Sequence, residues 1–429
     1  MSLERHPSIA CLLLVLTTAG CDALLPPRPP APPKTAAPSP AHDLVERPPD
    51  QLVEGKILLG SPSLTAGITG NGPLALAEVE AWLADPKNHE PLEFVLPLGL
   101  RELASEVKIP ADNPLTRAKI ELGRQLFVDP RLSHPDRKIA CFFCHIPLHS
   151  FTDHVVVGNP EGGLPKRVPP MTINRLFGEA QFWDGRAATL EAQTVMPIFS
   201  SHELGSSPAA CLAFLEGNPV YRRQFEKIFG QVSVDNVGRA LASFLRAIVT
   251  GPSRYDYWRE QQRLRALPPG DSNPHEQAEA DKLARLYPFS SVAQRGHALF
   301  TGKAGCADCH TGPNFTDEQF HNLGVGFDGP KPDLGRFLVT GKEADRGAFR
   351  TPTLRNVSRS PGYMHASQLS SLADVVDFFV AGGIANQQLD PALRPLELSK
   401  QEKAELLAFL ESLTSPVPPV SLGRLPAEE

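Results

Sequence analysis

Two stretches of the chain carry the hydrophobic periodicity of an amphipathic helix. In residues 237–248 and 402–413, apolar residues recur at intervals of three and four, so each stretch would form a helix that buries one face. Two shorter runs, residues 123–127 and 296–300, each predict the end of an earlier helix. Strand signals are sparse. The pattern therefore predicts a mostly α-helical protein with two similar halves, each opened and closed by a helix.

The first residues of the chain have the pattern of an export signal. Residues 5–6 are basic, residues 11–16 are apolar, and small residues lead to Cys21. The pattern resembles a bacterial lipoprotein signal that is cleaved before Cys21, whose thiol then carries the lipid. Thr18 departs from it, because such signals usually have leucine at this position. Ordinary secretion with cleavage nearby is the alternative, and residues 1–21 are the predicted signal peptide in both cases.

Residues 22–50 follow as a proline-rich segment. Ten of them are proline and few are apolar. Proline fixes φ and removes a backbone donor, so the segment predicts an extended, semi-rigid spacer without a core, or an unstructured N-terminus. A lipid on Cys21 and such a spacer would tether a globular body to a membrane. We expect an exported, periplasmic protein that is anchored to a membrane as a lipoprotein.

Composition places the rest of the chain among globular proteins. The whole chain has 429 residues, which is long enough for two or three domains with cores, and 41% of them are hydrophobic. The formal net charge of -6 argues against a protein that coats nucleic acid, so no nucleic-acid partner is expected. The longest apolar run, residues 9–20, is shorter than the roughly 18–20 residues of a membrane-spanning helix.

The cysteines carry the most informative pattern. Four of the seven form two C-x-x-C-H motifs: Cys141, Cys144 and His145, then Cys306, Cys309 and His310. In this motif the two thiols attach to the vinyl groups of one haem, and the histidine binds its iron as proximal ligand. A zinc site and a redox C-x-x-C pair are the alternatives. A zinc site usually has its two cysteine pairs close together in the sequence, whereas these two motifs are far apart. We predict two covalently bound haem c groups; Cys211 has no partner and is expected to be a buried thiol.

Two haem motifs inside two helical halves predict two tandem cytochrome c-like domains. Each domain would surround one covalent haem, with long irregular loops around it. A charged segment broken by residues 268–270 would connect them. After residue 50 we predict five parts: an N-terminal extension (residues 51–106), the first haem domain (107–256), a connection (257–290), the second haem domain (291–416) and a tail (417–429).

Five further motifs lie in an order and at spacings that resemble one known family. They are residues 112–116 (DNPLT), 122–127 (LGRQLF), 181–187 (QFWDGRA), 190–193 (LEAQ) and 349–357 (FRTPTLRNV). Together with the haem motifs, they resemble the bacterial di-haem cytochrome c peroxidases and their relatives of the MauG type. The resemblance extends from residue 107 to residue 415. Residues 314–317 and 321–322 favour the MauG-like branch, which includes enzymes that oxidise residues of a partner protein.

The resemblance implies a role for each haem and for the residues near it. In the family the first, peroxidatic haem reacts with peroxide and the second stores or delivers electrons; His145 and His310 would be their proximal iron ligands. Trp183 resembles the tryptophan between the haems and would relay electrons, although a lone tryptophan is usually a core aromatic. Glu203 falls where the family has its distal acid–base carboxylate, with a solvated glutamate as the alternative. Gln193 stands where the family has a glutamine in the distal pocket. A purely structural role for this polar residue is an equally supported alternative.

Two departures from the family pattern change the expectation. Many of these peroxidases have a histidine shortly after the proximal one, which plugs the reactive haem until reduction opens it. Residues 157–163 contain none, and His149 and His154 are misplaced and expected to be solvated, so the first haem should be five-coordinate or water-bound without reductive activation. The family also binds one calcium ion through an asparagine just after an arginine. Here Val168 follows Arg167, so calcium would depend on backbone carbonyls and water, and its presence stays open.

The family's motif does not supply the other axial ligand of the second haem in this chain. In the family a methionine or a tyrosine binds this iron from a helix after residues 349–357, and the corresponding residue here is Phe379, which has no lone pair. Met364 is the substitute we single out, because its loop lies in the right part of the domain and a thioether would raise the reduction potential. Tyr363, His365 and the absence of a protein ligand are alternatives, as is a Met364 that only packs on the haem edge.

The resemblance predicts an enzyme that reduces hydrogen peroxide at the first haem with electrons relayed through the second. The electron donor would be a small cytochrome or a cupredoxin. One alternative is a MauG-like enzyme that oxidises tryptophan or tyrosine residues of a partner protein. The other is a non-catalytic di-haem electron-transfer protein, against which Glu203 argues, because a pure electron carrier has no use for an acid in an open distal pocket.

Overall fold

The protein is described from a computed structural model, which covers residues 55–154, 167–268, 270–271, 273–327, 331–422 and 424–427. All of these residues belong to one compact unit, Leu44–Glu429. The predicted signal peptide, Cys21 and the proline-rich segment lie outside the described residues, and so do residues 157–163. Within the described ranges, no helix is long and apolar enough to cross a bilayer.

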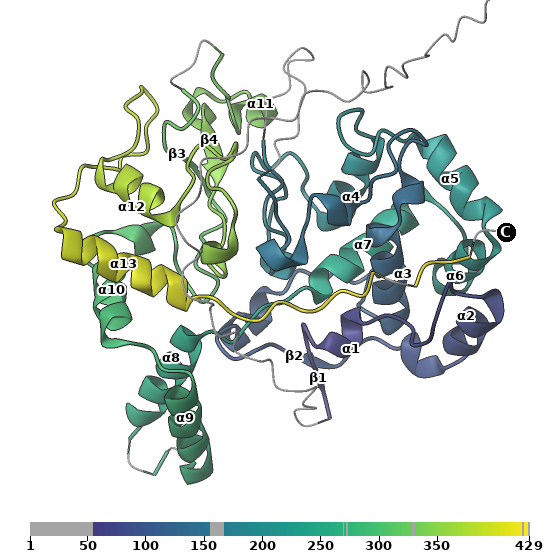
Figure 1. The fold of residues 1–429 in the computed structure, drawn as a ribbon, viewed down its shortest axis with the longest axis horizontal. Helices are drawn as coiled ribbons and strands as arrows, with labels where there is room; N and C mark the ends of the chain where they lie inside the picture. The colour runs from purple at the N-terminus through teal and green to yellow at the C-terminus, as the bar shows by residue number, and fades with distance from the viewer. Residues whose placement is uncertain are drawn as a thin grey trace, which may run out of the picture. The chain divides into compact units, whose positions relative to one another are not determined.

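The first half is a helical body in which α7 lies at the centre (Figure 1). Its helices are α3 (Arg117–Val128), α4 (Leu190–Phe199), α5 (Pro208–Gly217), α6 (Pro219–Phe229) and α7 (Val234–Ala247). The periodic stretch 237–248 forms most of α7, which packs against both α3 and α4. Side-chain oxygens of Thr116 and Ser233 accept hydrogen bonds from the first turns of α3 and α7, so both helices start at capping residues.

The second half repeats this plan with fewer helices and one small sheet. It contains α10 (Ser291–Thr301), α11 (Phe337–Thr340), α12 (Leu372–Val380), α13 (Lys400–Ser412) and the antiparallel strands β3 (Phe320–Asn322) and β4 (Ala348–Arg350). The predicted periodic stretch 402–413 lies mostly in α13, which packs on α10 as α7 packs on α3. The mostly helical fold predicted from the pattern is confirmed.

Each half closes where its first and last helices cross at a glycine. A Cβ on Gly123 of α3 would overlap the Ala240 carbonyl oxygen of α7, and a Cβ on Gly296 of α10 would overlap the Glu405 carbonyl oxygen of α13. Only glycine permits this approach. An aromatic pair lies beside each crossing: Phe127 with Phe244, ring centroids 5.1 Å apart, and Phe300 with Phe409, 4.9 Å apart. The halves are therefore two copies of one helix crossing, as two cytochrome c-like domains require.

The loops of the two halves also match. Asn174 and Asn356 both adopt a left-handed backbone, with φ of 56° and 59°. Their side-chain oxygens accept the backbone N–H of Thr250 and Ser415, so each asparagine ties a haem-side loop to the chain after its last helix. Both haem motifs begin in a 3-10 helix. The first motif begins in η4 (Cys141–Phe143) and the second in η7 (Cys306–Asp308). The other 3-10 helices among the described residues are η1 (Pro86–Asn88), η2 (Arg101–Glu106), η3 (Pro130–Leu132), η5 (Pro147–His149), η6 (Arg175–Phe177), η8 (Glu343–Asp345) and η9 (Val357–Arg359).

The N-terminal extension and the C-terminal tail pack together on the first half. The extension contains β1 (Ile57–Leu58), α1 (Pro62–Thr65), α2 (Leu76–Leu83) and β2 (Phe94–Val95), with β1 and β2 parallel. The tail leaves α13 and crosses to this region (Figure 1), where Leu74 N–H donates to the Leu425 carbonyl and Arg424 pairs with Glu78 at 2.9 Å. Arg124, buried in α3, donates to the carbonyls of Ser421 and Arg424. The tail therefore helps to cover the first half.

The predicted connection forms a helical hairpin. α8 (Arg254–Arg265) packs against α9 (Pro274–Leu286), and Figure 1 shows the pair projecting beyond α10. At the base of the hairpin, Asp256 forms a fully buried ion pair with Arg355 of the second half, 2.8 Å apart. The sequence signals only the break at residues 268–270, because the hairpin buries few apolar side chains.

Candidate active site

His145 and His310, the predicted proximal ligands, are oriented by the same kind of backbone hydrogen bond. His145 Nδ1 lies 2.9 Å from the Phe151 carbonyl, and His310 Nδ1 lies 3.0 Å from the Phe315 carbonyl. A carbonyl accepts, so each Nδ1 carries the proton and each Nε2 keeps its lone pair for a metal. Burial lowers the pKa of both imidazoles, which favours this neutral form.

The cysteines of both motifs are free thiols next to these histidines. No disulfide joins Cys141, Cys144, Cys306 or Cys309. Burial raises the pKa of Cys141 to about 12 and that of Cys306 to about 11, so the thiols stay protonated and apolar at neutral pH. Two free thiols and an Nε2 lone pair at each motif fit a covalent haem c, and no residue competes for the thiols by forming a disulfide.

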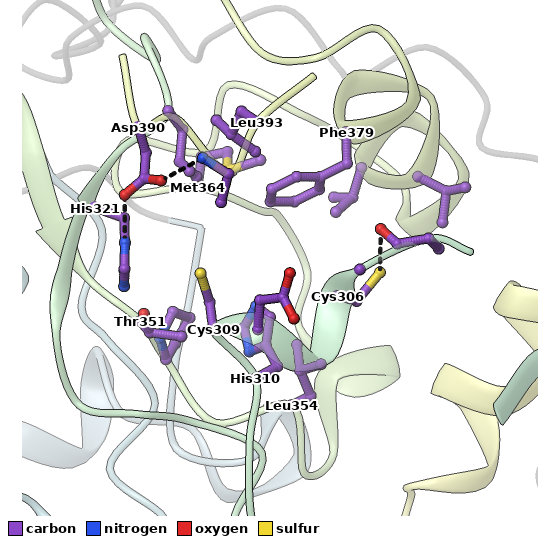
Figure 2. Close-up of a pocket in the computed structure, with 18 of the residues that line it drawn as sticks. Cys306, Cys309, His310, His321, Thr351, Leu354, Met364, Phe379, Asp390 and Leu393 are labelled. Carbon is purple, nitrogen blue, oxygen red and sulfur yellow. Dashed lines mark hydrogen bonds and ion pairs between the residues drawn. The ribbon is translucent and has the colours of Figure 1, made fainter. Parts of the chain in front are cut away.

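A cavity of about 320 Å³ lies beside the second motif, within the roughly 300–1,000 Å³ of small-molecule sites. Figure 2 shows Cys309 and His310 on one side of the open space and Met364 and Phe379 on the other. The lining is mainly apolar, as a haem face requires. Tyr363 and His365 also line it, so each candidate for the second axial position borders the same cavity.

The Met364 backbone has a left-handed conformation, with φ of 69°. Phe182 has the same conformation at the matching point of the first half, with φ of 68°. A shared turn therefore produces this conformation in both halves, and it is not by itself a sign of iron binding. What distinguishes the second half is the residue type, because methionine offers a thioether where the first half has a phenyl ring.

His321 lies at the rim of this cavity between two carboxylates. Its Nδ1 donates to Asp390 at 2.7 Å and its Nε2 donates to Asp317 at 2.9 Å (Figure 2 shows the first). Hydrogen bonds to Cys309, Asp390 and Asp317 raise the pKa of His321 to about 10. Cys309, Asp317 and His321 also present donor atoms close enough for a metal ion. Attachment of a haem to Cys309 would remove the largest of these effects and would use the thiol that a metal ion needs, and His321 would keep its hydrogen bonds to the Asp390 and Asp317 carboxylates.

Glu203 lies within electrostatic reach of the first haem motif. Its charge contributes to the raised pKa of Cys141 and of Cys144, after the larger effect of burial. Burial also raises the pKa of Glu203 itself, against the opposing charge of Arg186. Arg137 fixes the backbone here, since its guanidinium donates to the carbonyls of Glu203 and Ser201. Glu203 is therefore a half-buried acid near the first motif, and not a freely solvated side chain.

Gln193 lies in α4, which packs on α7 through its buried residues Leu190, Thr194 and Ile198. Pro197 stands one turn after Gln193 inside the helix and has no N–H, so the Gln193 carbonyl loses its helical donor. Gln193 and Pro197 are four residues apart and share a face of α4. The sequence motif drew attention to Gln193 but not to the proline.

Trp183 belongs to the first half and lines the cavity of the second. Its indole N–H donates to the Val168 carbonyl at 2.8 Å, and its own carbonyl accepts the Arg350 N–H at 2.8 Å. Arg336 donates to the carbonyls of Asp184 and Gly185 from the second half. The loop that carries Trp183 is thus held by groups from both halves.

A buried ion-pair cluster supports this loop. Arg167 pairs with Asp184 at 2.6 Å and with Asp333 of the second half at 2.8 Å, and none of the three side chains is more than 9% exposed. The Arg167 guanidinium also lies over the Phe349 ring, 5.2 Å from its centroid. Sequence reasoning missed Asp333, because nothing in its neighbourhood signals a partner so distant in the chain.

The remaining candidates from the sequence have simple surroundings. Cys211 is buried, as predicted. The His154 side chain is 63% exposed, also as predicted. His149 is instead half-buried, and its Nδ1 is buried without a hydrogen-bond partner among the described residues.

Comparisons with known proteins point to one family. Residues 117–263 match the family model described as di-haem cytochrome c peroxidase. The chain is 38% identical over 322 residues to the methylamine utilization protein MauG of Methylorubrum extorquens, covering 74% of this chain and 84% of that protein. It is 33% identical over 324 residues to the cytochrome c551 peroxidase of Nitrosomonas europaea, covering 74% and 86%.

Solved structures agree as well. The crystal structure of a MauG-like protein associated with microbial copper homeostasis superposes with a TM-score of 0.60 at 29% identity, covering 72% of this chain and 93% of that one. The family binds two covalent haem c groups, and this chain contains two C-x-x-C-H motifs. The chain therefore belongs to the di-haem cytochrome c peroxidase family, which includes the MauG proteins.

Proposed function

We propose that this protein is a peroxidase that reduces hydrogen peroxide at the first haem with electrons relayed through Trp183 and the second haem. The observation that carries the proposal is the placement of one half-buried acid, Glu203, near the first motif and of one indole, Trp183, at the cavity of the second. When bound, the haem irons supply the redox chemistry of O–O cleavage. The residues supply proton transfer and the path for electrons.

Glu203 acts as the proton shuttle. Cleavage of peroxide requires a group that takes a proton from one oxygen and returns it to the other. Burial raises the pKa of this carboxyl, which brings it closer to working pH and improves it as an acid and a base. Arg137 and Arg186 fix its backbone and its charge environment. A pure electron carrier would have no use for this arrangement, so the non-catalytic alternative is disfavoured.

Trp183→Phe should leave the reaction of the first haem with peroxide intact and slow the oxidation of an external donor. Phenylalanine keeps the ring but loses the readily oxidised indole and its hydrogen bond to Val168. We expect a loss of at least about tenfold, which corresponds to about 1.4 kcal/mol. Stopped-flow rates with a reduced cytochrome donor test this, with Trp82→Phe of the N-terminal extension as control. Unchanged donor oxidation would mean that electrons take another route.

We propose Met364 as the second axial ligand of the second haem. It lies across the cavity from His310, and the corresponding family position, Phe379, cannot bind iron (Figure 2). The oxidised protein should show a methionine–iron charge-transfer band that Met364→Ala abolishes and Met196→Ala, an exposed change on α4, preserves. A band that survives Met364→Ala, or a high-spin second haem that the substitution does not alter, would leave Tyr363, His365 or no protein ligand.

A MauG-like reaction, in which the oxidised side chains belong to a partner protein, is the second candidate. The absence of histidine in residues 157–163 and the 38% identity to a MauG protein favour it. The two functions differ in the electron source. Consumption of peroxide at the expense of a reduced cytochrome or cupredoxin supports the peroxidase. Peroxide-dependent oxidation of tryptophan or tyrosine on a co-purified protein, without that donor, supports the MauG-like enzyme.

Calcium and the membrane anchor stand as further proposals. Arg167 already places a cation between the Asp184 and Asp333 carboxylates, and the Val168 carbonyl is engaged by the indole of Trp183. We propose that this ion-pair cluster takes the place of the family's calcium ion.

We also propose export to the periplasm and a lipid anchor on Cys21. Labelling of whole cells with a fatty-acid probe would test the anchor, with Cys21→Ala as control.

A further inference from the structure

An aromatic cluster lies behind the second haem motif, on the side away from the cavity. Tyr255 and Trp258 of α8 meet at 5.9 Å between ring centroids, and His297 of α10 lies 5.2 Å from the Tyr255 ring. The Tyr255 ring also contacts Phe315, 5.5 Å away, whose carbonyl accepts the hydrogen bond of His310 Nδ1. Two ring contacts and one hydrogen bond therefore connect Trp258 to the proximal ligand.

Tyr255 has a proton acceptor within reach. Its hydroxyl lies 3.4 Å from His297 Nε2, which is a long hydrogen bond of the kind that tightens in a working complex. Burial, with a smaller effect of Arg259, lowers the pKa of His297, which keeps the imidazole neutral and able to accept. Burial also raises the pKa of Tyr255, so the phenol keeps its proton until it is oxidised.

The position of the cluster suits a path between the protein surface and the haem. Tyr255 is only 8% exposed, whereas Trp258 is half-buried and reaches solvent. The chain has five tyrosines and three tryptophans, and three of those tyrosines lie between residues 255 and 287. Oxidisable side chains are thus concentrated at the hairpin, and Tyr255 contacts the second motif's Phe315.

We propose that Tyr255 and His297 form a redox-active tyrosine–histidine pair and that Trp258 passes electrons to it from a donor at the α8 surface. Tyr255 gives one electron to the oxidised second haem and its phenolic proton to His297 Nε2, which leaves a neutral tyrosyl radical and an imidazolium. Trp258 then returns one electron, His297 returns the proton, and the external donor reduces Trp258. The oxidant is hydrogen peroxide, which takes two electrons and two protons per molecule to form two waters, so this proposal rests on the proposed function.

The first test is electron paramagnetic resonance of the holoprotein, frozen shortly after one equivalent of hydrogen peroxide and without an added donor. We expect a tyrosyl radical in the wild type and in Tyr287→Phe, and its loss in Tyr255→Phe. The Tyr255→Phe change keeps the aromatic contacts and removes only the hydroxyl, and ring-deuterated tyrosine would narrow the wild-type signal. A haem spectral change without a tyrosyl radical, or a radical that persists in Tyr255→Phe, overturns the proposal.

The second test needs no peroxide and therefore separates this proposal from the proposed function. Azide radicals made by pulse radiolysis oxidise tryptophan in the reduced holoprotein, and reoxidation of the second haem is followed by absorbance. Tyr255→Phe and Trp258→Phe should slow it by at least about tenfold, or about 1.4 kcal/mol, relative to wild type and Tyr287→Phe. Equal rates in all four proteins contradict the route through Tyr255. If peroxide causes no haem change at all, the proposed function fails and the radiolysis result alone decides on Tyr255.

Discussion

Glu203→Gln is expected to retain both covalent haems and to lose most peroxide turnover. The amide matches the carboxyl in size but can neither take nor return a proton, and a positioned acid–base group commonly contributes about 10²–10⁴-fold. The loss should appear in the first reaction with peroxide and not in electron delivery from the donor. Stopped-flow measurement of the peroxide-dependent haem change, together with a haem stain for covalent attachment, checks this expectation.

Glu216→Gln is the matched control, because this glutamate is exposed on α5 and far in sequence from both motifs. It should behave as the wild type. A Glu203→Gln protein that turns over peroxide within a factor of about two of the wild type would exclude Glu203 as the shuttle, because it would lack the about 10²-fold minimum effect of such a group.

The pH profile gives an independent readout of the same carboxyl. Burial raises the pKa of Glu203 above its ordinary value, and the shuttle must start deprotonated to accept a proton. Peroxide reaction should therefore be fastest above this raised pKa and should fall as pH decreases through it. In Glu203→Gln this acid limb should disappear and a low, flat rate should remain. An unchanged acid limb in that variant would assign the titration to another group.

Arg167→Gln is expected to destabilise the protein by about 3–5 kcal/mol, because removal of one partner leaves buried charges uncompensated. Here Asp333 loses its guanidinium partner, and Asp184 keeps only the more exposed Arg186 at 3.1 Å; both carboxylates are less than a tenth exposed. Asp184 adjoins Trp183, so the loop between the halves should loosen, and donor oxidation should slow more than the reaction with peroxide. Denaturant unfolding of the holoprotein measures the stability.

Two comparisons give this prediction its specificity. Arg346→Gln removes a partly exposed ion pair with Glu343 and a contact with the Phe337 ring, and it should cost much less stability than Arg167→Gln. A calcium chelator should also leave the wild type unchanged if Arg167 acts in place of the ion. A wild type that the chelator destabilises, and an Arg167→Gln protein that it does not destabilise further, would show that the cation at this junction is calcium.

The helices and the haem attachment sites were predictable because their signals are local. Periodicity at three and four residues requires only the adjacent turns, and α7 and α13 appear where it predicts them. Each C-x-x-C-H motif carries its whole chemistry in five consecutive residues. Gly123 and Gly296 stand in the short runs that predict the ends of α3 and α10, but the need for glycine arises only where α3 crosses α7 and α10 crosses α13.

Features that depend on distant partners gave no such signal. The carbonyls of Phe151 and Phe315 orient the proximal histidines only because both residues adopt a positive φ, 60° and 53°, which the sequence does not announce for phenylalanine. Asp333 is meaningful only beside Arg167. The hairpin of α8 and α9 has a charged surface with few apolar positions, so its sequence resembles a loop even though its inner side is aromatic.

The most direct test of the central claim is stopped-flow spectroscopy of the fully oxidised holoprotein mixed with one equivalent of hydrogen peroxide, without any reductant. Residues 157–163 lack the histidine that would block the first haem, so this haem should be open to peroxide. We predict an immediate spectral change, and we predict that the peroxide is consumed to the same extent with and without prior reduction of the second haem. A protein that leaves peroxide untouched until it has been reduced, or that never consumes it, would contradict the account.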